Sequence, residues 1–217
     1  MFIEVNGIKL FYEKTGAGRP LVMVHGNGED HKIFDKAIEL LKKKYTVYAV
    51  DSRCHGESEK TAELHYDDMA DDMIAFIEAL DLQDVIFYGF SDGGIVGLLA
   101  AAKCPRITTL ITSGANVTPD GVSGSIQLLI KVLYYFKKDP MYALMLNEPH
   151  ISDELLGAIK AKTLILAGSR DLVKEKETRH IAETIPGAVL RILKGEGHGS
   201  YIVHNEKIAR LIMDFAM

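Results

Sequence analysis

The stretch Gly89-Phe90-Ser91-Asp92-Gly93-Gly94 decides the fold of this chain. A short apolar run, Val85 to Tyr88, precedes it, and a second apolar run from Ile95 to Ala102 follows it. Such runs are typical of a buried strand and a buried helix. The glycines beside Ser91 permit a sharp turn, because a side chain in their place would clash with the neighbouring strand and helix. The sequence therefore predicts a strand, a tight turn and a helix, with the Ser91 hydroxyl standing clear of the sheet.

The same alternation of strands and helices continues on both sides of this turn. Near the N-terminus, Asn6-Gly7 between two strand-like runs predicts a β-hairpin of residues 2–5 and 8–13. Alternating strands and helices predict an α/β fold with a mainly parallel twisted sheet and helices on both faces. The further expected strands are 21–24, 45–50, 85–88, 107–112, 163–167 and 189–193, and the expected helices are 33–44, 66–80, 94–103, 174–185 and 206–215.

This alternation of strands and helices stops after Ser113. Residues 116–125 are rich in glycine, proline and polar side chains, 126–136 form an apolar helical stretch, and short helical pieces run on to about residue 160. We therefore expect a core domain made of residues 1–115 and 161–217, interrupted by a small helical cap insertion at 116–160.

The amino-acid composition indicates which kinds of partner and which cellular compartment to expect. The 217 residues carry a formal net charge of −5, which predicts neither a nucleic-acid partner nor attraction to an anionic membrane. Two cysteines, Cys54 and Cys104, are too few for a disulfide framework and favour a reducing compartment. The first residues do not resemble a signal peptide, and no apolar run approaches the ~20 residues of a membrane helix. A cytoplasmic protein is the expectation.

A serine hydroxyl becomes a good nucleophile only when a base takes its proton and an acid holds that base in place. Asp171 follows the expected strand 163–167, and His198 lies among three glycines after the strand 189–193. Each residue taken alone also has a plain structural interpretation: Ser91 as a small turn residue, Asp171 as a turn residue or helix cap, and His198 as a surface histidine.

A loop at His25-Gly26-Asn27-Gly28 follows the expected strand 21–24. A tetrahedral oxyanion needs two hydrogen-bond donors aimed at it in advance. The backbone N–H groups of Asn27 and Asp92 are the candidate donors, and His25 is expected to brace the loop. The same glycines would also suit an ordinary turn at the end of a strand.

Together these motifs resemble the α/β-hydrolase family over nearly the whole chain, because His25-Gly26, the loop 51–58, Gly89 to Gly93, Asp171 and Gly197-His198 occur in the family's order. The resemblance is greatest to small bacterial carboxylesterases, lactonases and C–C hydrolases. It implies that Ser91 is the nucleophile, His198 the general base and acid, and Asp171 the orienting acid. Neither a metal nor an organic cofactor is implied.

The resemblance implies a serine hydrolase that cleaves small carboxylic esters or thioesters through an acyl-enzyme on Ser91. Three alternatives stay open. A C–C bond hydrolase or a perhydrolase would use the same fold and residues. A ligand-binding receptor could retain the three residues and turn over slowly. A haloalkane dehalogenase is disfavoured, since that chemistry uses a carboxylate where Ser91 stands.

Two positions depart from the family's pattern. Cys54 stands where the loop 51–58 usually has a glycine, and we interpret it as a substituted turn residue and not as half of a Cys54–His55 catalytic pair. The insertion is short for a cap, which predicts an open pocket and leaves room for a homodimer whose second subunit covers the site. Ile126 and Ile130 are candidate substrate contacts on its underside.

Asp92 supports one finer hypothesis. A carboxylate directly after the nucleophile could select substrates with a cationic group, such as amino-acid esters, and some amino-ester-cleaving relatives resemble this chain in Ser-Asp-Gly-Gly. The alternative, which we favour, is that Asp92 is held in a hydrogen-bonded turn and does not contact the substrate.

Overall fold

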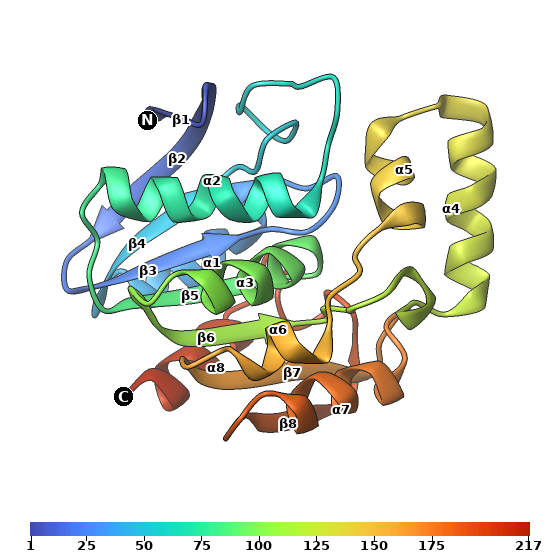
Figure 1. Ribbon diagram of the computed structural model, residues 1–217. Helices are drawn as coiled ribbons and strands as arrows, with labels where there is room; N and C mark the ends of the chain where they lie inside the picture. Colours follow the sequence, from blue (N-terminus) through green and yellow to red (C-terminus); the bar gives the residue numbers. More distant parts are fainter.

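The computed structural model describes residues 1–217 and contains one eight-stranded sheet (Figure 1). The strand order is β1-β2-β4-β3-β5-β6-β7-β8, and every pair from β4 to β8 is parallel, while β1, β2 and β4 pair antiparallel. The expected α/β fold class with an antiparallel N-terminal hairpin is confirmed. The strands are β1 Phe2–Val5, β2 Ile8–Gly16, β3 Arg19–Val24, β4 Tyr45–Val50, β5 Val85–Phe90, β6 Ile107–Ser113, β7 Lys162–Arg170 and β8 Val189–Gly197.

Helices cover both faces of the sheet. One face is covered by α2 (Tyr66–Ala79), α3 (Asp92–Lys103), α6 (Asp153–Gly157) and α7 (Glu175–Thr184), which share one large apolar cluster with the strands. The other face is covered by α1 (Asp35–Leu41) and α8 (Lys207–Ala216). Alternate residues of β3 illustrate the two layers, since Val22 packs in the first cluster and Met23 in the second. A 3₁₀ turn at His31–Phe34 begins the segment that the sequence suggested was a single helix.

The insertion projects from one end of this body (Figure 1). The projecting part contains the 3₁₀ turn η2 (Pro119–Gly121) and the helices α4 (Gly124–Lys137) and α5 (Pro140–Asn147), whereas α6, also within the expected insertion 116–160, packs on the core beside α3 and α7. The segment between η2 and α4 is fixed to the core just after β7. Val122 forms a β-bridge with Val173 there, and Ser123 N donates to Leu172 O at 2.9 Å. The insertion is therefore attached at the end of the sheet where β5, β6 and β7 finish. None of the helices combines the length and the apolar character required to cross a bilayer.

Candidate active site

Ser91 occupies the turn between β5 and α3 with a backbone φ of +52°, a value that few residues other than glycine adopt. The flanking glycines explain how the turn is held. A Cβ atom on Gly89 would overlap the carbonyl of Gly93, and one on Gly93 would overlap the carbonyl of Val24 in β3. Backbone hydrogen bonds from Ser91 N to Ser113 O (2.8 Å) and from Gly93 N to His25 O (3.0 Å) fix the turn to the adjacent strands. The strained turn is thus stabilised from both sides.

The structure brings Ser91, His198 and Asp171 together from three separate segments. Ser91 Oγ lies 3.1 Å from Nε2 of His198, and Nδ1 of the same ring lies 2.6 Å from Oδ1 of Asp171. The ring also packs at a centroid distance of 5.0 Å from Phe90, which restricts its orientation. In this arrangement the imidazole can accept the serine proton while the carboxylate holds the opposite nitrogen as the donor.

Asp171 is held as an anion by its surroundings. Burial opposes its ionisation, but hydrogen bonds from His198 and from the N–H groups of Val173 and Gly168 outweigh that effect and keep the pKa of Asp171 below its usual value. Both backbone donors approach at 3.1 Å. The carboxylate can therefore stabilise a positive charge that forms on His198 during a reaction.

The loop after β3 is braced as the sequence suggested. His25 is buried, its Nδ1 lies 2.8 Å from Gly26 O, and its Nε2 accepts a hydrogen bond from Ser52 N at 3.1 Å. Burial, reinforced by repulsion from His55, lowers the pKa of His25 to about 4. A neutral ring bonded on both nitrogens holds the loop in place and has no free nitrogen with which to move a proton. The N–H groups of Asn27 and Asp92 make no backbone hydrogen bond and stay free as donors.

Asp92 is anchored within the protein while it borders the cavity beside Ser91. The residue is 3% exposed, and its Oδ2 accepts a hydrogen bond from Asn27 Nδ2 at 2.9 Å. Burial raises the pKa of Asp92, and hydrogen bonds from Asn27 and Tyr66 only partly oppose this rise. The imidazoles of His55 and His198 also favour the charged form of the carboxylate, but less than the two hydrogen bonds do.

Glu29 and Gly114 are among the residues at the site that the sequence analysis missed. Glu29 Oε2 accepts a hydrogen bond from Gly26 N at 3.0 Å, and a Cβ on Gly26 would lie 2.8 Å from that oxygen and 3.0 Å from Ser91 Cβ. Burial raises the pKa of Glu29, although the Gly26 N–H and His198 oppose the rise. Gly114 leaves room for the His198 ring, because a Cβ there would lie 2.7 Å from its Cε1. Neither relationship has a local pattern that would reveal it.

A small cavity of about 40 Å³ lies beside Ser91, narrower than the open pocket that the short insertion predicted. Met145 of α5 and Glu148 help to close it. Of the two isoleucines predicted to contact the substrate, Ile126 lines this cavity and Ile130 does not. Ile130 lies one turn further along α4, about 6 Å along the axis, and is buried. Helix α4 as a whole packs on α5 and η2. The lining residues are Tyr66, Ser91, Asp92, Asn116, Val122, Ile126, Met145, Glu148, Leu172, Val173 and His198.

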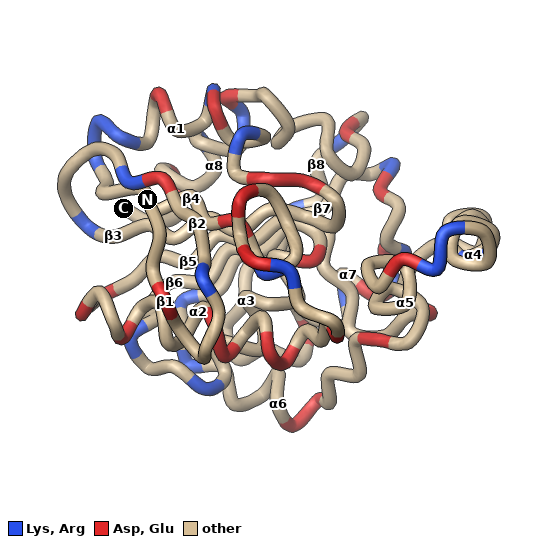
Figure 2. The backbone as a smooth tube through the Cα atoms, turned by 90° about the horizontal axis from the view of Figure 1, so that it is seen from above, with Lys and Arg blue, Asp and Glu red and all other residues tan.

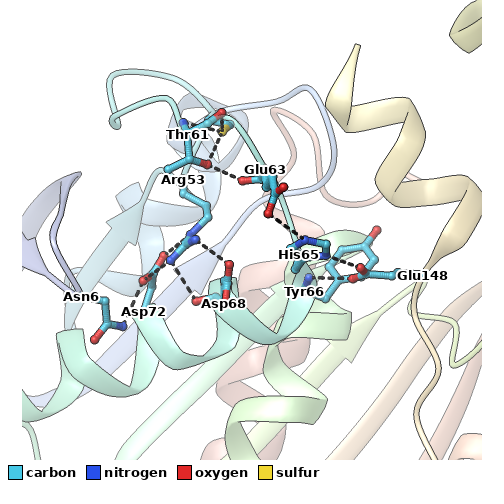
Figure 3. A network of polar contacts seen from close by, with 10 residues as sticks. Asn6, Arg53, Thr61, Glu63, His65, Tyr66, Asp68, Asp72 and Glu148 are labelled. Carbon is cyan, nitrogen blue, oxygen red and sulfur yellow. Dashed lines mark hydrogen bonds and ion pairs between the residues drawn. The ribbon is translucent and has the colours of Figure 1, made fainter. Parts of the chain in front are cut away.

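A polar network holds one wall of this cavity (Figure 3). Glu148, which follows α5, lies 2.6 Å from Nδ1 of His65 and accepts a hydrogen bond from Tyr66 N at 3.0 Å. Tyr66 is the first residue of helix α2. The same helix carries Asp72, whose carboxylate pairs with Arg53 Nε and Nη2 at 2.7 Å. The network therefore connects the insertion and the loop 51–58 to one helix, and it places Tyr66 and Glu148 at the cavity.

Cys54 adopts a φ of +65°, the backbone conformation that its family position requires of a glycine. Its Sγ lies 3.2 Å from Thr61 N, and both cysteines are free. His55 has Nδ1 against Arg53 O at 2.9 Å and makes no hydrogen bond to Cys54. The geometry agrees with a substituted turn residue.

Comparisons with known proteins agree with this architecture. A family model described as alpha/beta hydrolase fold matches residues 19–143, more than half of the chain. The chain is 29% identical to the AB hydrolase superfamily protein YisY of Bacillus subtilis, in an alignment that covers 96% of each protein. It is 26% identical to the serine hydrolase BPHL of Mus musculus, covering 98% of this chain and 84% of the relative.

Solved structures show the same fold. The esterase EaEST from Exiguobacterium antarcticum superposes with a TM-score of 0.86 at 24% identity, covering 99% of this chain and 98% of that one. The enol-lactonase from Burkholderia xenovorans LB400 superposes with a TM-score of 0.83 at 20% identity, covering 100% and 99%. The chain therefore belongs to the α/β-hydrolase fold family.

Proposed function

We propose that this chain is a serine hydrolase that cleaves small carboxylic esters or thioesters through an acyl-enzyme on Ser91. The family model and the curated relatives show a hydrolase of the α/β fold. The observation that carries the proposal is the continuous path of hydrogen bonds from Ser91 Oγ through His198 to Asp171, at 3.1 and 2.6 Å.

The proposed reaction has two halves. Ser91 Oγ attacks the carbonyl carbon while Nε2 of His198 takes its proton, and the N–H groups of Asn27 and Asp92 donate to the oxyanion. His198 then gives the proton to the departing alcohol or thiol, which leaves an ester on Ser91. Water then attacks the acyl carbon while His198 removes its proton, which forms a second tetrahedral intermediate. The bond from the acyl carbon to Ser91 Oγ breaks as His198 returns the proton to Oγ, and the acid is released.

The small cavity supports a short acyl group as the bound part of the substrate. Its apolar lining from Ile126, Met145 and Leu172 suits an alkyl chain of a few carbons. Tyr66, Asn116 and Glu148 add polar atoms at the same cavity.

Labelling with a fluorophosphonate probe, combined with turnover of p-nitrophenyl acetate, tests the proposal. We expect the probe mass on Ser91 in the wild type, none in Ser91→Ala, and many turnovers per molecule. A labelled protein without multiple turnovers would favour a ligand-binding receptor. Cleavage confined to a diketone, or peracid formation without ester hydrolysis, would favour the C–C hydrolase or the perhydrolase. Absence of both label and turnover would refute the proposal.

A further inference from the structure

Helix α4 carries apolar side chains on both of its sides. The side toward the molecule supplies Ile126 to the cavity and buries Ile130. The opposite side, here called the α4 outer face, consists of Leu128, Leu129, Val132, Tyr135 and Phe136, with exposed fractions of 63%, 51%, 45%, 70% and 77%. Spacings of three and four residues place these five side chains on one side of the helix. A helix that is apolar all round is normally buried all round, so this face has no partner within the chain.

This exposure is concentrated and not scattered. The α4 outer face supplies five of the ten large hydrophobic side chains that the chain exposes, and two of the other five are the terminal residues Met1 and Met217. Figure 2 shows α4 at the margin of the molecule, beyond α5, where other parts of the chain leave it uncovered. Contiguous exposed apolar patches mark surfaces that bind a partner.

The charge around this face has the opposite sign to the charge of the whole chain. Residues 121–138 contain Lys131, Lys137 and Lys138, all exposed, and no Asp or Glu, whereas the chain as a whole carries −5. The next acid in sequence, Asp139, is occupied as the N-cap of α5, where it accepts from Met141 N at 2.9 Å. A partner that fits this surface is therefore apolar and anionic.

We propose that the α4 outer face docks on an anionic lipid surface. The side chains of Leu128, Leu129, Val132 and Phe136 would enter the boundary between the lipid headgroups and the acyl chains. Tyr135 would lie there with its hydroxyl toward the headgroups. Lys131 and Lys138 are long enough to reach the phosphates beside the buried face. The negative charge of the whole molecule, which argues against membrane attraction, is carried by other segments. Docking does not require that the lipid be the substrate.

A second copy of the chain fits this face less well. A helix of 14 residues is about 21 Å long, and one face about 10 Å wide offers on the order of 200 Å². A stable dimer needs about 800 Å² from each partner. Two copies packed through α4 would also bring the lysines of one copy close to those of the other. A lipid surface needs neither a matching shape nor a large area from one helix.

The absence of tryptophan from the sequence provides a background-free probe. In Phe136→Trp, we expect the indole emission to shift to the blue with vesicles of equal parts phosphatidylcholine and phosphatidylglycerol. The shift should be absent with phosphatidylcholine alone and should reverse at about 0.5 M salt, because salt screens the lysines. Phe2→Trp is the matched control, since Phe2 is 53% exposed on β1, and its emission should not change.

Cosedimentation with the same vesicles supplies a second measurement. Lys131→Glu should lower the vesicle partition coefficient about thirtyfold, since the reversal changes two unit charges and each contributes about fivefold at an anionic surface. The matched change Lys176→Glu on α7 should leave binding unchanged, and circular dichroism checks the fold of both variants. Failure of the mixed vesicles to shift Phe136→Trp, or equal shifts at Phe2 and Phe136, would overturn the proposal. So would a concentration-dependent dimer that Leu128→Ser abolishes without any lipid binding.

Discussion

Nε2 of His198 lies 3.1 Å from Oγ of Ser91, although 107 residues separate the two in the chain. The contact exists because β5 and β8 end at the same edge of the sheet, so that the turns after them face each other. Asp171, which contacts the other nitrogen of the same imidazole, follows β7, and β7 lies between β6 and β8 in the sheet.

Asp171→Asn should lower kcat for p-nitrophenyl acetate about 10⁴-fold. An amide cannot hold His198 in the tautomer that accepts the Ser91 proton, and it cannot balance the imidazolium charge. Asp153→Asn, an exposed residue on α6, serves as the control and should match the wild type. A loss smaller than tenfold in Asp171→Asn would contradict the role given to Asp171.

Glu29 should act by positioning the loop that carries Asn27. Glu29→Ala removes the acceptor for Gly26 N, and we expect kcat to fall by about tenfold with KM nearly unchanged, because a misplaced oxyanion donor weakens the transition state. Glu29→Gln keeps an acceptor oxygen and should restore most of kcat. Equal kcat losses in the two variants would show that the hydrogen bond to Gly26 is not what matters.

Asp92 should make the stability of the protein depend on pH. Its pKa is raised in the folded state, so the folded state binds more protons than the unfolded state above the unfolded pKa. Stability is therefore lost as pH rises from the usual carboxyl value through the folded pKa. Asp92→Asn removes this cost, and its Tm should exceed that of the wild type by a few degrees at pH 7. The difference should vanish below about pH 4, and a constant difference across this range would be inconsistent with the shift.

Substrate charge should matter little to turnover. Because the Asp92 carboxylate is already bonded to Asn27, we expect matched cationic and neutral esters to have similar kcat/KM values, and Asp92→Asn to change both in parallel. A preference of tenfold or more for the cationic ester that disappears in Asp92→Asn would instead show that the carboxylate binds the substrate's positive group.

The narrow cavity should favour short acyl chains. We expect kcat/KM to fall at least tenfold from p-nitrophenyl acetate to the decanoate, since the longer chain does not fit beside Ser91. Met145→Ala removes a side chain from the lining and should shift the preference toward longer esters. Leu144→Ala, a buried neighbour on α5 outside the lining, controls for general loosening of the helix.

The sequence was most informative where the signal is local. The apolar runs around Ser91 predicted a strand and a helix because burial on a sheet and periodicity in a helix leave direct marks on the sequence. The contact of Glu29 with Gly26, and the space that Gly114 leaves for His198, depend on how separate segments approach one another. The periodicity of α4 did not distinguish Ile126, which lines the cavity, from Ile130, which does not. When a helix is apolar all round, its periodicity does not tell which side faces a cavity.

The side chain of Asn27 makes a second contact, which connects it to the insertion. Besides Asp92, its Nδ2 reaches the carbonyl of Met141 in α5 at 3.4 Å. One amide therefore fixes the position of the insertion relative to the loop that carries the proposed oxyanion donor. Substitutions far out in the insertion could tune the rate through this single link while Ser91, His198 and Asp171 stay untouched, which makes the insertion a natural target for selecting faster variants.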